Sequence, residues 1–158
     1  MAQITLRSYI EYIEDRLQRD AHPEVVAQCR HVLASYPRYI EIYKLLARSL
    51  LDQENYQDAL DLFQRVLSAD PNDFLAHVGI SECYRENGAL DQAIWHLERA
   101  FEQVPNNTEI QGEIRRLYAE RDGQIPRRLY LTNGALARLY LRGRLHQQAI
   151  AELRTALA

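Results

Sequence analysis

Apolar residues along this chain recur at steps of three and four, which is the spacing of one face of an α-helix. One such stripe, within residues 40–53, consists of Tyr43, Leu46, Ala47 and Leu50. A second stripe, within residues 56–69, consists of Ala59, Leu60, Phe63, Val66 and Leu67. A short polar stretch at residues 52–55 separates the two. The pattern therefore predicts two helices joined by a tight turn.

The same arrangement returns with a period of 34 residues. Three of the five prolines, Pro37, Pro71 and Pro105, are 34 residues apart. Apolar columns follow the same step: Val25, Ala59 and Ala93; Cys29, Phe63 and Leu97; Val32, Val66 and Ala100. Proline suits the first turn of a helix, because its missing N–H is not needed there. The period predicts a stack of helix hairpins.

The residues at these positions resemble the tetratricopeptide repeat family, whose pattern sets large, small and aromatic residues at fixed spacing before a proline. One copy reads Tyr43, Leu46, Ala47, Leu50, Ala59, Phe63 and Pro71. The next copy reads His77, Ile80, Ser81, Tyr84, Ala93, Leu97 and Pro105. The resemblance implies an all-α fold, a right-handed α-solenoid of antiparallel helix hairpins with about 8–9 helices.

The copies differ in quality along what we expect to be one domain, residues 1–158. Residues 6–39 predict a degenerate first repeat, and residues 40–73 and 74–107 predict two regular ones. Residues 108–129 predict an irregular repeat with an insertion at 122–129, and residues 130–158 a truncated one. Because a solenoid normally ends in a polar capping helix, we expect the sequence to be a fragment of a longer solenoid.

Composition narrows the class of protein. The 158 residues are 47% hydrophobic and 26% charged, which is typical of globular chains and not of disordered ones. No apolar run approaches the ~20 residues that span a bilayer, and no signal peptide is recognisable at the N-terminus. We therefore expect a cytoplasmic protein without a membrane partner. Cys29 and Cys83 are predicted to be buried packing thiols.

Motifs for catalysis are absent from the sequence. It contains no dinucleotide or phosphate-binding glycine loop, no nucleophile elbow and no metalloprotease histidine pair. The five histidines show no ligand spacing with cysteines or carboxylates. The sequence predicts a protein that is not an enzyme and that holds no cofactor and no metal.

The resemblance implies that the first helix of each hairpin lines a concave, peptide-binding groove. By repeat phase, the predicted groove residues are Glu41, Lys44, Arg48, Leu51, Asp52, Leu75, Val78, Glu82, Arg85 and Glu86. Charges of both signs beside Leu75 and Val78 suit an amphipathic segment. The alternative is that these charges pair along or between helices. We predict a non-catalytic scaffold that binds an unidentified protein or peptide.

Basic residues gather in the last third of the chain. Residues 1–110 carry 10 basic and 18 acidic side chains, whereas residues 111–158 carry 9 and 4. A candidate patch for an acidic partner consists of Arg115, Arg116, Arg121, Arg127 and Arg128. Binding of nucleic acid or another polyanion is the alternative function. It is the less favoured one, because charge runs are usually solvated or internally paired, and Tyr130 and Tyr140 fall at phases expected to be buried.

The apolar residues of the final predicted helix indicate self-association. Its apolar residues, Leu145, Ala149, Leu153, Ala156 and Leu157, have no following repeat in the sequence to cover them. An uncapped solenoid end exposes an apolar face, and a two-fold contact is the commonest solution for identical chains. We therefore predict a homodimer through the C-terminal helix.

Overall fold

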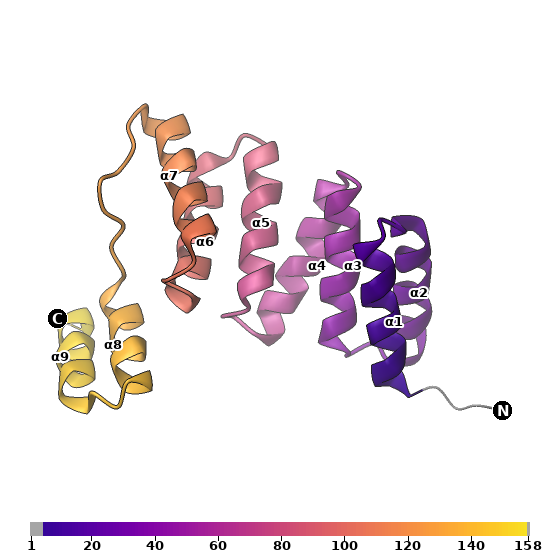
Figure 1. The fold of residues 1–158 in the computed structure, drawn as a ribbon, viewed down its shortest axis with the longest axis horizontal. Helices are drawn as coiled ribbons and strands as arrows, with labels where there is room; N and C mark the ends of the chain where they lie inside the picture. Colours follow the sequence, from indigo (N-terminus) through magenta and orange to yellow (C-terminus); the bar gives the residue numbers. More distant parts are fainter. Residues whose placement is uncertain (1–4, 158) are drawn as a thin grey trace.

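The computed structural model describes residues 5–157, and within that range it contains nine α-helices and no strand (Figure 1). The helices are α1 (Leu6–Gln18), α2 (His22–Ser35), α3 (Ile40–Asp52), α4 (Tyr56–Ala69), α5 (Phe74–Glu86), α6 (Leu90–Gln103), α7 (Thr108–Asp122), α8 (Asn133–Arg142) and α9 (His146–Leu157). Consecutive helices pack as hairpins, and the hairpins stack in chain order up to α7. This architecture confirms the predicted all-α helical-repeat solenoid.

Polar side chains fix where the helices begin. Asn55, Asp73 and Asn107 each cap a helix by accepting a backbone N–H, and in Asp73 the Oδ1 atom lies 2.8 Å from the nitrogen of Ala76. Thr132 caps α8 in the same way. Such caps satisfy amide groups that have no partner inside the helix.

A side-chain donor near the start of successive helices bonds to the main-chain carbonyl of each periodic proline. The hydroxyl of Tyr43 donates to the carbonyl of Pro37 at 2.9 Å, and the amide of Gln111 donates to the carbonyl of Pro105 at 2.7 Å. Between these two repeats, His77 Nε2 lies 3.1 Å from the carbonyl of Pro71. These three side chains are 34 residues apart, so each repeat closes its boundary with the same bond from a different residue type.

Small residues allow the helices to approach closely. Ala47, Ala59 and Ala93 are completely buried. The hydroxyl of Ser81 donates to the carbonyl of Ala93 at 2.7 Å. A Cβ atom on Gly79 would fall 2.3 Å from the ring of Phe63, so the contact between α4 and α5 requires glycine at this position.

The fourth repeat has one helix where the others have two. Gly123 ends α7 with a φ of 70°, and residues 124–131 then run to α8 without forming a helix or a strand, with bends at residues 124 and 127 (Figure 1). Leu129 and Leu131 pack against the apolar cluster of α6 and α7. The predicted insertion began at residue 122, whereas Asp122 still belongs to α7. The segment after α7 covers part of the face that a second helix would otherwise cover.

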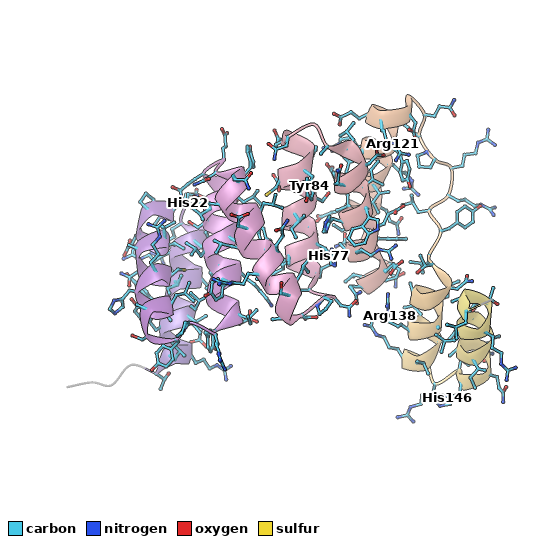
Figure 2. The ribbon with its side chains drawn as sticks, turned by 180° about the vertical axis from the view of Figure 1, so that it is seen from behind. His22, His77, Tyr84, Arg121, Arg138 and His146 are labelled. Atoms are coloured by element: carbon cyan, nitrogen blue, oxygen red, sulfur yellow. The ribbon has the colours of Figure 1, made fainter. Side chains whose placement is uncertain are left out.

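A buried carboxylate attaches the last hairpin to the body. Glu102 accepts a hydrogen bond from Thr132 at 2.6 Å and ion-pairs with Arg99 and Arg138, each at 2.9 Å. Figure 2 shows Arg138 on α8, on the side that faces the body.

Ala149 was predicted to be one of the uncovered apolar residues of the last helix. This prediction is wrong, because Ala149 is completely buried where α9 packs against α8.

The close contacts around α4 generate a prediction about stability. We expect Ala59→Arg to lower the free energy of unfolding by about 3 kcal/mol or more, because the fully buried site offers the guanidinium no partner. Chemical denaturation followed by circular dichroism measures the change. Ala69→Arg is the matched control, since Ala69 is exposed on the same helix. Equal losses in the two variants would contradict the packing described for α4.

Candidate functional site

A cavity of about 340 Å³ lies on the first helices of the first three hairpins. Its lining residues come from α1, α3 and α5, with Phe63 of α4 reaching it beside Gly79. They are Glu14, Leu17, Gln18, Glu41, Lys44, Leu45, Arg48, Leu51, Asp52, Phe63, Leu75, Val78, Gly79 and Glu82. A second cavity of about 260 Å³ shares Val78 and Glu82 with it and continues along α5 to α7. We call the two together the groove.

Most of the residues predicted for the groove line its larger cavity. They are Glu41, Lys44, Arg48, Leu51, Asp52, Leu75, Val78 and Glu82. Arg85 lines the smaller cavity, where its guanidinium lies 3.5 Å from Glu113. Glu86 lines neither cavity, and it pairs with Arg85 at 2.6 Å.

Sequence reasoning missed the contribution of α1. Glu14, Leu17 and Gln18 line the larger cavity, although the first repeat is too degenerate for its groove face to be assigned by phase. The nearest signal in the sequence was Leu17, which belongs to the apolar stripe of that helix. Glu113 and Arg116 of α7 were missed as groove residues for the smaller cavity.

The charges of the groove are only partly neutralised. Lys44 is held by Asp73 at 2.6 Å and by Glu41 at 3.0 Å, so its charge is satisfied inside the protein. Among the described residues, no ion pair or side-chain hydrogen bond forms at Arg48 or Glu82. Burial raises the pKa of the Glu82 carboxyl above its ordinary value. Among the described residues, the larger cavity thus offers one unpaired cation, Arg48, and two unpaired carboxyls, the exposed Glu14 and the partly desolvated Glu82, beside the apolar surface of Leu75 and Val78.

The five arginines of the predicted patch differ in their ion pairs and in their exposure. Arg116 pairs with Glu113 at 3.0 Å and faces the groove, and Arg121 pairs with Asp91 at 2.9 Å and with Asp122 at 2.7 Å. Arg115 is half-buried on α7. Arg127 and Arg128 lie on the segment between α7 and α8 and are exposed.

The two tyrosines that the sequence places near these arginines differ in their exposure. Tyr140 is half-buried. The prediction of a buried Tyr130 is wrong, since 81% of this residue is exposed. The repeat phase does not apply to Tyr130, because the segment is extended at that point.

Two histidines form a hydrogen-bonded pair between α5 and α6. The Nδ1 atoms of His77 and His96 lie 3.0 Å apart, and Tyr84 stacks on the His96 ring. Because His77 Nε2 donates to the carbonyl of Pro71, its Nδ1 accepts the proton of His96. Burial lowers the pKa of both rings, to about 4 in His96, where the charge of His77 adds to the effect. Figure 2 labels His77 and Tyr84 along α5.

The remaining candidate chemical groups are buried or dispersed. Burial raises the pKa of the Cys29 thiol to about 12 and that of Cys83 to about 11, so both thiols are protonated packing groups. Over residues 5–157, no group of three or more histidine, cysteine or acidic side chains could hold a metal ion. In the same range, no helix is both long and apolar enough to cross a membrane.

Comparison with known proteins gives one family and one fold. Residues 50–117 match the family model described as tetratricopeptide repeat. No curated protein matches the sequence. Among solved structures, MamA from Desulfovibrio magneticus is similar with a TM-score of 0.68 and 14% identity, over 96% of this chain and 73% of that chain. A thermophilic repeat protein from Thermus thermophilus has a TM-score of 0.63 and 21% identity, over 96% of this chain and 89% of that chain.

The histidine pair generates a prediction about pH. The unfolded chain takes up a proton on His96 near pH 6.5, whereas the folded protein does so only near pH 4. The stability that comes from keeping His96 neutral is therefore complete above pH 6.5 and is lost progressively as the pH drops toward 4. Urea denaturation at pH 7, 5.5 and 4.5 measures this loss. We expect His96→Gln to reduce the loss, and His146→Gln, at an exposed histidine, to leave it unchanged. The same pH dependence in both variants would contradict the assignment to His96.

Proposed function

Since the chain carries tetratricopeptide repeats, we propose that it binds a segment of a partner protein in the groove. The tetratricopeptide fold is generally a scaffold for protein–protein interaction. The observation that carries the proposal is the larger cavity, whose lining combines apolar and charged side chains. Binding surfaces typically combine these two kinds of contact, because burial supplies affinity and charges supply register.

The chemistry of the groove limits what its ligand can be. Leu51, Leu75 and Val78 provide contact for at least one apolar side chain. Arg48 suits a carboxylate on the ligand, since arginine offers a planar fork of donors, and Glu82 suits a cation. The ligand is therefore an amphipathic protein segment that carries charges of both signs.

Nucleic-acid or polyanion binding is the second candidate function, and it has less support. Two of the five arginines in the predicted patch, Arg116 and Arg121, are neutralised by carboxylates of the protein itself. Several unpaired cations on one surface are what phosphate backbones require. Arg127 and Arg128 are the adjacent exposed pair that favours this candidate.

We also propose self-association through the last hairpin. Large apolar side chains of α8, α9 and their turn are 43–88% exposed: Leu141, Leu145, Ile150, Leu153 and Leu157. A concentration of exposed apolar side chains is typical of an interaction site. A symmetric contact between two copies buries them from both sides.

The groove proposal is tested with peptides selected for binding from a displayed random library. We expect Arg48→Ala and Leu75→Ala to weaken the selected peptides by about tenfold, which corresponds to about 1.4 kcal/mol. Fluorescence anisotropy measures the affinity. Thermal stability should change little, by about 0.5 kcal/mol or less, because both side chains are exposed.

The matched control is Arg30→Ala, at an exposed arginine on α2, outside the groove. It should leave peptide affinity unchanged. If every selected peptide bound the groove variants as tightly as the wild type, the groove would not be the binding site. If Arg48→Ala destabilised the fold as much as Ala59→Arg, Arg48 would be structural.

The self-association proposal predicts a concentration-dependent dimer that Leu153→Glu dissociates. The introduced carboxylate would have to be desolvated at the apolar contact, which opposes association. Light scattering after size-exclusion chromatography measures the mass. Leu75→Glu is the matched control, since Leu75 is also exposed but lies in the groove. A monomeric wild type at high concentration would refute the proposal.

A further inference from the structure

The extended segment after α7 leaves its main chain unpaired. No backbone N–H or carbonyl of residues 124–131 makes a hydrogen bond to another residue in the described part of the chain. Elsewhere the hairpin loops are short and bond back to the helices that they join. An extended run of free donors and acceptors is the edge that an added strand can pair with.

The body of the protein holds this edge in place from one side. Leu129 and Leu131 pack against the cluster of α6 and α7, whereas Tyr130 between them is exposed. This alternation is the side-chain pattern of a strand with one face covered. Residues 128–131 contain no bend or turn and are anchored by the two leucines, and no strand pairs with them among residues 5–157.

The surroundings of the edge combine a cavity with unpaired positive charge. A cavity of about 330 Å³ lies beside Leu129 and Tyr130, and Phe101, Ile114 and Tyr118 contribute apolar surface to it. Arg127 and Arg128 are exposed, and among the described residues neither forms an ion pair. Tyr118 donates its hydroxyl to Glu98 at 2.7 Å, and both residues line this cavity.

We propose that residues 128–131 bind an acidic, extended peptide of a partner protein by strand addition. The peptide's main chain pairs with the free backbone groups of this segment. Its carboxylates meet Arg127 and Arg128, and one apolar side chain enters the cavity beside Phe101 and Ile114. This surface is separate from the groove, so its occupation does not depend on the function proposed there.

Charge and backbone chemistry select this occupant over two others. A second copy paired through the same segment would bring four arginines together, which opposes association. Single-stranded nucleic acid would satisfy the arginines, but stacking surfaces for successive bases require several aromatic side chains, and Tyr130 is the one exposed aromatic on the segment. Nucleic acid also leaves the donors and acceptors of the edge without a matching main chain.

The test uses a fluorescein-labelled peptide that alternates glutamate with valine. Its twin has the same sequence with alternate backbone amides N-methylated, which keeps the charge and blocks strand pairing. We expect the unmodified peptide to bind about tenfold more tightly than its twin. Equal affinity for the two peptides would overturn strand addition, because charge alone would then account for binding.

Charge-reversal variants locate the site. We expect the double variant Arg127→Glu, Arg128→Glu to bind the unmodified peptide about tenfold or more weakly, with an unchanged helical circular-dichroism spectrum. The matched control, Arg30→Glu with Arg154→Glu, reverses two exposed charges elsewhere and should bind as the wild type does. Loss of binding in the control alone would overturn the site. Tighter binding of a thymidine oligonucleotide than of the peptide, abolished by the first double variant, would replace the proposal with nucleic-acid binding.

Discussion

The close approach of helices at small residues is the constraint on which the rest of this structure depends. At Gly79 the ring of Phe63 occupies the space that a Cβ atom would need, and at Ala59 and Ala93 the neighbouring helices leave no solvent-accessible surface. Helices that pack this closely stack in a fixed order, because each hairpin contacts only its neighbours. The stack aligns α1, α3 and α5 side by side, with α7 continuing the row, and this alignment creates the groove. Phe63 both fills the packing site and forms part of the groove wall, so packing and binding surface share one residue.

The 34-residue period made most of the fold and part of the groove predictable from sequence. It places residues of α3 and α5 on one side, where most of those predicted for the groove line the larger cavity, because a helix of known phase presents known residues to one side. The period cannot assign a helix face where the repeats lose their characteristic residues. For this reason α1 was not assigned to the groove, although Leu17 and Gln18 line it. The phase also says nothing about pairing between repeats: Lys44 counts as a groove cation in its own repeat, but Asp73 at the start of the next helix neutralises it. Tyr130 was misplaced for a related reason, since a helical phase has no meaning in an extended segment.

One repeated bond shows how the fold tolerates different residues at equivalent positions. The carbonyl before each repeat boundary needs a donor, and Tyr43, His77 and Gln111 all supply one. The requirement is for a hydrogen-bond donor at the correct distance, and it does not specify the residue type. Histidine adds a property that the other two lack, because its second ring nitrogen remains to accept a bond. His96 donates to that acceptor, so this second bond requires that His77 Nδ1 carries no proton. The bond to the Pro71 carbonyl survives protonation of His77, because Nε2 still donates, whereas the bond from His96 does not.

The fourth repeat lacks one helix, and this loss changes the hydrogen bonding of the backbone, whereas degeneracy of a repeat changes only its side chains. A degenerate helix such as α1 still satisfies its own backbone, so it changes only the side chains that it presents. Residues 124–131 stand where a helix would be expected. In a helix their backbone N–H and carbonyl groups would bond to one another, whereas here these groups have no partner in the described part of the chain. Leu129 and Leu131 retain the packing role of the missing helix, while Glu102 takes over the attachment of the hairpin that follows. With packing and attachment supplied by these residues, Arg127, Arg128 and Tyr130 have no packing role in the fold, and exposed side chains without a structural role are the ones available for recognition.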